Sequence, residues 1–212
     1  MILLVGGEKG GSGKSCLAQN LAVYFKIQYQ SEVLLVDCDP QRTSSDWIQE
    51  RKDTSLPQLN CVQLYGNIRE DLLSLKNRYD FVVVDCGGQD NRALRSTMAV
   101  ASHALIPLRP KRRDLKTLPH MEDIISTCKM VNPTLKAAVV MTQCPALPNQ
   151  AKRILDAKDV CESFCVPVLD SIIYSRNVYD DSEERGLSVV EIEPDGKAAA
   201  EIKAIAKEFM DL

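Results

Sequence analysis

The residues best suited to chemistry lie between Glu8 and Ser15, where the sequence reads Glu-Lys-Gly-Gly-Ser-Gly-Lys-Ser. Glycines at this density let backbone N–H groups curl around anionic oxygens without a Cβ in the way. Lys14 adds a cation for phosphate groups, and the Ser15 hydroxyl is a suitable Mg²⁺ ligand. The segment therefore predicts a phosphate-binding loop, and the alternative is a glycine-rich turn without a ligand. The expected nucleotide contacts are consecutive: Gly10, Gly11, Ser12, Gly13, Lys14, Ser15 and Cys16.

Carboxylates follow two short apolar runs of the sequence. Asp37 and Asp39 come after Val33–Val36, and Asp85 directly follows Phe81–Val84. A carboxylate at the end of a buried strand is costly unless it is paired, and hydrated Mg²⁺ is a fitting partner. Asp85 is therefore a candidate for a metal site, and Asp37 and Asp39 are further candidate site residues. The alternatives are an acidic turn and a strand-end aspartate held by backbone N–H groups.

Composition limits the other chemistry that the chain can do. A net charge of −3 and a pI near 5.5 give no overall attraction to nucleic acid or anionic membrane, so such binding needs a local cationic patch. The eight cysteines read as free thiols of a cytoplasmic protein, because no export signal precedes the first apolar run. His103 and His120 lack metal-ligand spacing and read as structural. The candidate phosphate contacts are Arg92, Arg95, Lys111-Arg112-Arg113, Lys152, Arg153 and Arg176.

Short apolar runs alternate with segments of helical period along the whole chain. This alternation predicts an α/β fold with a doubly wound, mostly parallel sheet flanked by helices, in one domain over residues 1–212. Apolar stripes predict helices after the glycine loop, around Met121 and near Ile205. Ligand-binding loops are expected at the carboxyl ends of the strands. The predicted strands are Ile2–Val5, Val33–Val36, Cys61–Leu64, Phe81–Val84, Ala104–Leu108, Ala137–Met141 and Val166–Leu169.

Several motifs together resemble the ParA/MinD family of deviant Walker A ATPases. The run from Lys9 to Ser15 is similar to the family's phosphate loop, although the usual spacing asks for glycine where this chain has Glu8. Asp37-Cys38-Asp39-Pro40-Gln41 resembles the second family signature. The family usually has threonine or a proline pair where this chain has Cys86-Gly87-Gly88, a flexible loop suited to sensing the γ-phosphate. Further similarity lies at Ala104–Pro110 with Asp114-Leu115, at Ser175-Arg176-Asn177 and at Arg185–Val189, so it covers nearly the whole chain.

The resemblance implies a P-loop NTPase of SIMIBI-like fold that binds ATP and Mg²⁺ and works as an ATP-dependent homodimer. In the family, the lysine at the position of Lys9 contacts the partner's nucleotide, and Asp39 would orient the attacking water. Asp37 would support Mg²⁺ and Lys14, and Asp85 would belong to the Walker B strand. Hydrolysis is expected to be slow and stimulated by a partner. Thr142 and Gln143, after the sixth predicted strand, are candidates for adenine contact, with an ordinary loop as the alternative.

Three alternative functions stay open. The first is partition of DNA or a plasmid, or positioning of another cargo, by a nucleoid-associated dimer that binds DNA non-specifically through Arg176, Lys152 and Arg153. A ParB-like adaptor would stimulate it. It resembles the short ParA type, without an N-terminal helix-turn-helix extension.

The second alternative is MinD-like membrane positioning, which the balanced charge of Lys197–Leu212 argues against. The third is a metabolic or iron–sulfur enzyme of related fold. Its cluster ligands would be Cys86 with Cys128 or Cys144, or Cys161 with Cys165.

Overall fold

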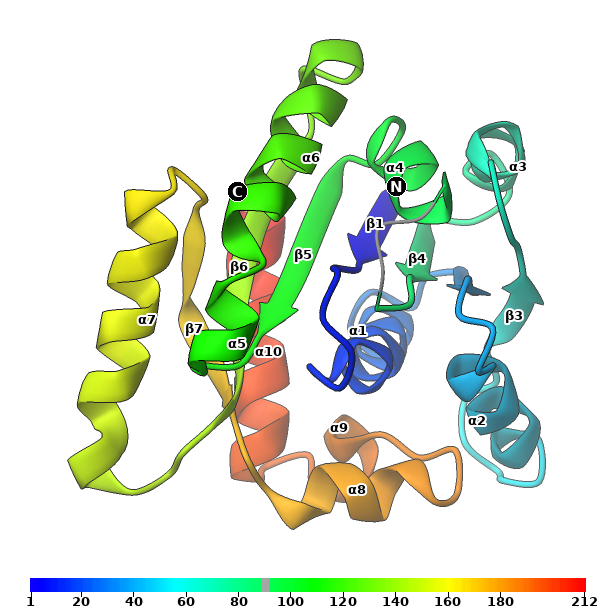
Figure 1. Cartoon of the computed structure of the whole chain (residues 1–212). Coiled ribbons are helices and arrows are strands. Elements are labelled where there is room, and N and C mark those ends of the chain that lie inside the picture. The colour runs from blue at the N-terminus through cyan, green and yellow to red at the C-terminus, as the bar shows by residue number, and fades with distance from the viewer. Residues whose placement is uncertain (89–91) are drawn as a thin grey trace.

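A computed structural model describes residues 1–88 and 92–212, which form a seven-stranded sheet in the order β3-β2-β4-β1-β5-β6-β7 (Figure 1). Every neighbouring pair of strands is parallel, so the predicted doubly wound parallel sheet is confirmed. The strands are β1 (Ile2–Val5), β2 (Val33–Asp37), β3 (Asn60–Gln63), β4 (Phe81–Asp85), β5 (His103–Leu108), β6 (Lys136–Cys144) and β7 (Val168–Tyr174).

Two strands differ from the sequence prediction by more than one residue at an end. β7 starts and ends later in the chain than the predicted Val166–Leu169. Its polar residues interrupt the apolar pattern, but the strand accommodates them because it lies at the sheet edge and is partly exposed. β6 continues past Met141, so Thr142 and Gln143 lie within the strand and not after it. Pairing with β7 extends that far, since Cys144 is in register with Tyr174.

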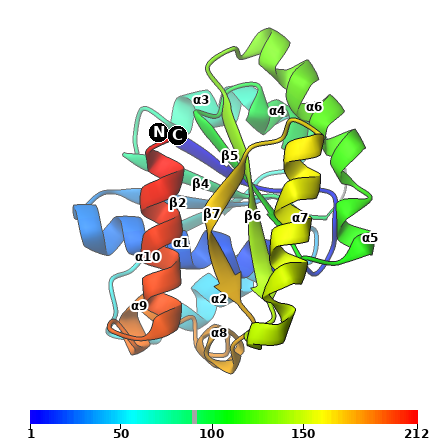
Figure 2. The ribbon, with the colours of Figure 1, turned by 90° about the vertical axis from the view of Figure 1, so that its left-hand side faces the viewer.

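Helices cover both faces of the sheet, as Figures 1 and 2 show. One apolar core lies between the sheet and α3, α4, α6 and α7, and the other lies between the sheet and α1, α2, α9 and α10. The helices are α1 (Lys14–Tyr29), α2 (Thr43–Arg51), α3 (Arg69–Leu75), α4 (Arg92–Met98), α5 (Arg112–Leu115), α6 (Leu118–Val131), the 3₁₀ turn η1 (Pro148–Gln150), α7 (Ala151–Ser163), α8 (Asn177–Glu183), α9 (Val189–Ile192) and α10 (Lys197–Met210).

The predicted helical stripes are the buried faces of α1, α6 and α10. In α1, Leu17, Leu21 and Phe25 are almost fully buried, and the ring of Phe25 stacks on Phe81 of β4 with centroids 4.6 Å apart. In α10 the stripe that ends at Phe209 packs against β7 and α1. The last helix is therefore docked on its own core, and its apolar face is not available to a bilayer. No helix in the described part of the chain is long and apolar enough to span one.

The strand order brings the predicted functional segments together. The chain crosses from β1 to β2 on one side of the sheet and from β4 to β5 on the other, so the strand order reverses beside β1. Ligands of such folds bind at the carboxyl ends of the strands at this point. In register, Val5 of β1 lies beside Asp85 of β4, which lies beside Asp37 of β2. The glycine loop that follows β1 and the two strand-end carboxylates therefore meet at one edge of the sheet.

Candidate functional site

The glycine loop joins β1 to α1 and is held by its own side chains. The Lys14 ammonium donates a hydrogen bond to the Lys9 carbonyl at 2.7 Å, and the Ser12 hydroxyl donates to the same oxygen at 3.2 Å. Lys14 is buried, and this desolvation lowers its pKa, opposed by the nearby carboxylates of Asp85 and Asp39. The Lys14 ammonium thus lies on the concave side of the loop. Phosphate oxygens bound there would take the place of the water that burial removes from it.

Two residues of β6 brace this loop from the side. The buried Thr142 hydroxyl donates to the Ser12 carbonyl at 2.8 Å, and the Gln143 amide donates to the Gly11 carbonyl at 3.0 Å. Thr142 and Gln143 were predicted as adenine contacts. The structure gives them a bracing role, although both also line the hollow beside α1.

Side chains further along the sheet hold the outer rim of the loop. Glu8 pairs with His120, which explains a glutamate where phosphate loops usually have glycine. Arg109 donates to both carboxylate oxygens of the buried Asp114, at 2.7 and 3.1 Å. The Nη2 nitrogen that donates to Asp114 also lies 3.5 Å from the Gly10 carbonyl. The loop shape is therefore set by tertiary contacts as well as by its glycines.

Asp37 is fully buried and its carboxylate is saturated with donors. One oxygen accepts from the backbone N–H and the hydroxyl of Ser45, at 2.8 and 2.7 Å, and the other accepts from the backbone N–H of Asp39 at 3.0 Å. These contacts fix the first turn of α2 to the end of β2. The predicted metal role of Asp37 gains no support, because its oxygens are directed at α2 and the following turn.

Asp85 is equally buried but has one free oxygen. Oδ2 accepts from the Ser44 hydroxyl at 2.7 Å, while Oδ1 has no hydrogen-bond partner in the described part of the chain. Burial raises the pKa of Asp85 to about 6, against the opposing effects of the Ser44 and Ser15 hydroxyls and of Lys14. An unpartnered buried carboxylate oxygen beside Ser15 and Lys14 fits a hydrated Mg²⁺.

The segment after β4 lies directly against the loop. A Cβ at Gly88 would be 2.9 Å from the backbone nitrogen of Gly10, so only glycine permits this approach. A Cβ at Gly87 would be 2.8 Å from a carboxylate oxygen of Asp39. Asp39 and Gly88 also line a hollow of about 270 Å³ over the loop with Lys14 and Ser15. A ligand in that hollow would touch both flanking segments, as a γ-phosphate sensor requires.

A second hollow of about 370 Å³ continues from the loop toward α8. Its walls include Cys16, Thr142 and Gln143, together with Asp180 and Glu183 of α8. Neither Asp180 nor Glu183 is predicted to be a site residue from the sequence. No motif marks them, because only the packing of α8 against the start of α1 brings them to the site.

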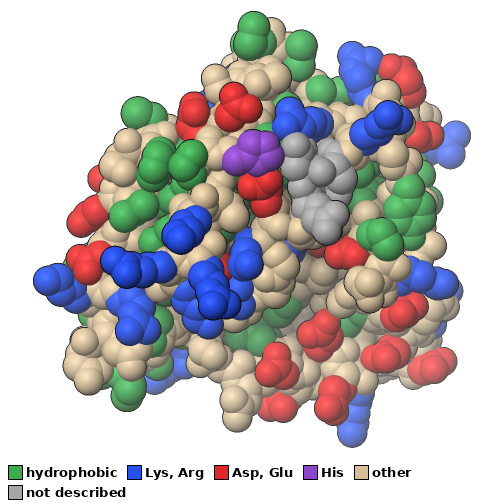
Figure 3. Space-filling view, viewed as in Figure 1, with side chains coloured by type: hydrophobic (Ala, Val, Ile, Leu, Met, Phe, Trp, Pro, Cys, Tyr) green, Lys and Arg blue, Asp and Glu red, His purple; other side chains and the backbone are tan. Residues whose placement is uncertain are grey.

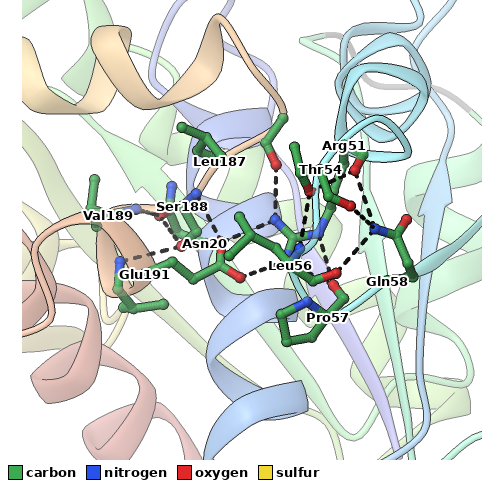
Figure 4. A network of polar contacts seen from close by, with 12 residues as sticks. Asn20, Arg51, Thr54, Leu56, Pro57, Gln58, Leu187, Ser188, Val189 and Glu191 are labelled. Carbon is green, nitrogen blue, oxygen red and sulfur yellow. Dashed lines mark hydrogen bonds and ion pairs between the residues drawn. The ribbon is translucent and has the colours of Figure 1, made fainter.

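A buried ion pair fixes α8 and α9 relative to α2, as Figure 4 shows. The Arg51 guanidinium pairs with Glu191 at 2.5 Å and also donates to the carbonyls of Pro57 and Gly186. A Cβ at Gly186 would lie 2.3 Å from the backbone nitrogen of Arg51, and the φ of Gly186 is +64°, so glycine is required there. This network links the helix that carries Ser44 and Ser45 to the segment that carries Glu183.

Charges are segregated on the face shown in Figure 3, with cations over α5 and α7 and carboxylates over α8 and α2. Lys111 and Arg112 lie across a groove of about 680 Å³ from Lys152 and Arg153. Arg176, the other predicted DNA contact, is instead paired with Glu201 at 2.6 Å. The structure therefore brings Lys152 and Arg153 together with α5 and leaves Arg176 engaged elsewhere.

None of the eight cysteines forms a disulfide, as expected. Cys86 lies beside Cys38, which directly follows β2, and their contact together with burial raises the pKa of Cys86. Across residues 1–88 and 92–212, no group of three or more His, Cys, Asp or Glu side chains is arranged to hold a metal ion. Magnesium binding at Asp85 does not require such a group of side chains, because Mg²⁺ keeps several waters and takes further ligands from phosphates.

A parallel sheet, a glycine loop that opens a helix, and a buried lysine and carboxylate at the same edge define a P-loop nucleotide-binding protein. Residues 3–189 match the CobQ/CobB/MinD/ParA nucleotide binding domain. The chain belongs to this family, and it is an ATPase of the ParA/MinD type.

Named relatives and a solved structure agree with this assignment. The chain is 29% identical to maintenance of carboxysome distribution protein A of Halothiobacillus neapolitanus, over 98% of this chain and 95% of the relative. It is 24% identical to chromosome partitioning protein ParA of Myxococcus xanthus, over 99% and 87% of the two chains. The fold is similar to that of the Pyrococcus furiosus cell division ATPase MinD, with a TM-score of 0.72 and 20% identity over 99% and 98% of the chains.

Proposed function

We propose that this chain is a switch that dimerises when it binds ATP with Mg²⁺ and then positions DNA or another large cargo. The contrast between the two loop lysines carries the proposal. Lys14 is turned inward against the loop backbone. Lys9 lines an open recess of about 340 Å³ beside Arg109 and α5, and its ammonium has no ion-pair partner in the described segments. It is therefore available to the phosphates of a second subunit.

The other site residues have complementary roles in this proposal. Loop N–H groups and Lys14 would contact the phosphates, and Ser15 would ligate Mg²⁺, which Asp85 would hold through water. Asp39, next to Gly87 at the open side of the loop, would orient the attacking water. Loss of the bridging phosphate would then weaken the dimer, because Lys9 would lose its anionic partner. We expect slow turnover that a partner accelerates.

A positioning role is supported by the names of two relatives, one for carboxysome distribution and the other for chromosome partitioning. The ATP-bound dimer would bind DNA non-specifically, and the cargo would be positioned along that DNA. A ParB-like adaptor is the expected stimulator where the cargo is itself DNA.

The groove between α5 and α7 is the proposed DNA contact. Lys111, Arg112, Lys152 and Arg153 are exposed around it and make no ion pair among the described residues. Arg176 is a weaker candidate, because binding phosphate would require breaking its pair with Glu201. A dimer presents two such grooves, so affinity should fall steeply with salt.

The test is binding of a random-sequence 30-base-pair duplex with ATP, ADP or no nucleotide at several salt concentrations. We expect salt-sensitive binding with ATP alone. Lys9→Ala should abolish it by preventing the dimer, and replacing Lys152 and Arg153 together with alanine should weaken it about tenfold or more. Lys129→Ala, an exposed lysine on α6 outside the groove, is the matched control and should bind normally.

Other results would direct the assignment elsewhere. ATP-dependent binding to anionic vesicles without DNA binding would favour a membrane-positioning ATPase. Visible absorbance from bound iron would favour an iron–sulfur enzyme. A Lys9→Ala variant that dimerised normally with ATP would contradict the proposed bridging role of this lysine.

A further inference from the structure

The hollow beside α8 is continuous with the hollow over the glycine loop. Both are lined by Gly11, Gly13, Cys16 and Glu183. The start of α1, at Ser15 and Cys16, is where the phosphate nearest the sugar would lie, because helix N-termini bind phosphate groups. A nucleotide whose terminal phosphates occupy the loop would therefore place its sugar near Cys16 and Glu183.

Most polar side chains around the second hollow already have partners. Thr142 and Gln143 donate to the loop backbone. Arg176 and the Tyr179 hydroxyl both donate to Glu201, at 2.6 and 3.0 Å. The two carboxylates that line this hollow, Asp180 and Glu183, have no hydrogen-bond or ion-pair partner among the residues that the structure describes.

The surroundings of Glu183 favour a ligand that donates hydrogen bonds. Its side chain is half-buried, and burial raises its pKa, with further increases from the neighbouring carboxylates of Asp180 and Glu50. No cation in the described segments compensates it. An ionised carboxylate only accepts hydrogen bonds, so the ligand group beside it must donate. Ribose hydroxyls are such donors, and they would lie near this carboxylate because a single carbon outside the ring joins the sugar to the phosphate chain.

The fold holds Glu183 in this position. Its own carbonyl accepts from Gly186 at 3.3 Å, and Gly186 is fixed by Arg51. One turn earlier, Tyr179 is anchored to α10 through Glu201. A side chain on a helix fixed at both ends gives a better-defined hydrogen-bond geometry than one on a free loop.

We propose that Glu183 recognises the ribose hydroxyls of the bound nucleotide, with Asp180 as a second acceptor one turn away, so that the site selects ribonucleotides over deoxyribonucleotides. This inference rests on the proposed nucleotide function and adds a specificity residue to it. The base itself would lie further out, between β7 and the Gln143 side of the hollow.

The experiment compares binding of ADP, 2′-deoxy-ADP and 3′-deoxy-ADP with Mg²⁺ by calorimetry, so that dimerisation does not contribute. Wild type should bind ADP about 10 to 100 times more tightly than at least one deoxy analogue, the range of a hydrogen bond to a charged group. Glu183→Gln should weaken ADP binding and reduce this discrimination to less than threefold. Glu184→Gln, the exposed neighbour that lines neither hollow, is the control and should discriminate like wild type.

Two outcomes would overturn the inference while leaving the nucleotide function intact. One is wild-type protein that binds all three nucleotides equally. The other is a Glu183→Gln variant that discriminates as strongly as wild type. Absence of ADP binding to wild type would instead contradict the nucleotide function itself, and the inference with it.

Discussion

Asp37 and Asp85 end neighbouring strands in the same register, and both are fully buried, but their surroundings are opposite. Three donors from α2 and the following turn saturate Asp37. Asp85 receives one side-chain hydrogen bond from Ser44 and keeps an oxygen without a partner. The first arrangement stabilises the fold, and the second leaves a buried charge that a cation would compensate.

The adjacent serines at the start of α2 create this difference. Ser45 is directed at Asp37 and Ser44 at Asp85, so one helical turn serves both carboxylates. Gln19 of α1 donates to the Ser44 hydroxyl at 3.3 Å, which ties the turn to the helix after the glycine loop. Equal burial therefore does not imply equal function, because the donor count decides which carboxylate can take a metal.

The largest expected effect is on catalysis at Asp85. Asp85→Asn should lower ATP hydrolysis about 100-fold or more, because a neutral amide no longer holds hydrated Mg²⁺ beside the phosphates. Its free energy of unfolding at pH 7 should be at least that of wild type, since the variant removes a buried charge. Hydrolysis assays and urea titrations check the two parts. A variant with normal turnover would remove Asp85 from the metal site.

A large effect on folding is expected at Asp37. Asp37→Asn should lower the free energy of unfolding by roughly 3–5 kcal/mol, because the amide nitrogen faces donors and a buried network is broken. Urea titration measures the loss, with Asp46→Asn as a control, because Asp46 is an exposed carboxylate on α2 beside Ser45. If Asp37→Asn folded as stably as wild type but needed more Mg²⁺ for ATP hydrolysis, Asp37 would belong to the metal site and would not be a structural carboxylate.

The sequence predicts one side of this site better than the other for a physical reason. Residues 9–15 act through consecutive backbone groups, so their spacing alone indicates phosphate binding, and the strand before them follows from its apolar run. Asp37 and Asp85 look alike in sequence, since each follows an apolar strand. What separates them is Ser44 and Ser45, whose orientation depends on how α2 packs. Glu183 comes from a segment that only tertiary contacts bring to α1.

The smallest expected effect is a pH dependence of stability that Asp85 contributes and Asp37→Asn leaves in place. Burial raises the pKa of Asp85 from an ordinary 3.8 to about 6 in the folded protein. Below pH 4 the carboxyl is protonated in both states. As pH rises from 4 to 6 the unfolded chain loses this proton while the folded protein retains it, so stability falls and then stays lower above pH 6. The full difference is at most about 3 kcal/mol.

Urea titrations of metal-free, nucleotide-free protein between pH 4.5 and 7.5 measure this contribution as wild type minus Asp85→Asn, which cancels the other titrating groups. The difference should favour wild type most at the acid end and shrink as the pH approaches 6. Asp37→Asn compared with the Asp37→Asn, Asp85→Asn double variant should show a slope of the same sign but smaller, because burial still raises the pKa of Asp85 while the Asp37 charge no longer adds to it. A difference independent of pH would mean that Asp85 is already compensated in the folded protein, and the contrast between the two carboxylates would then lose its electrostatic basis.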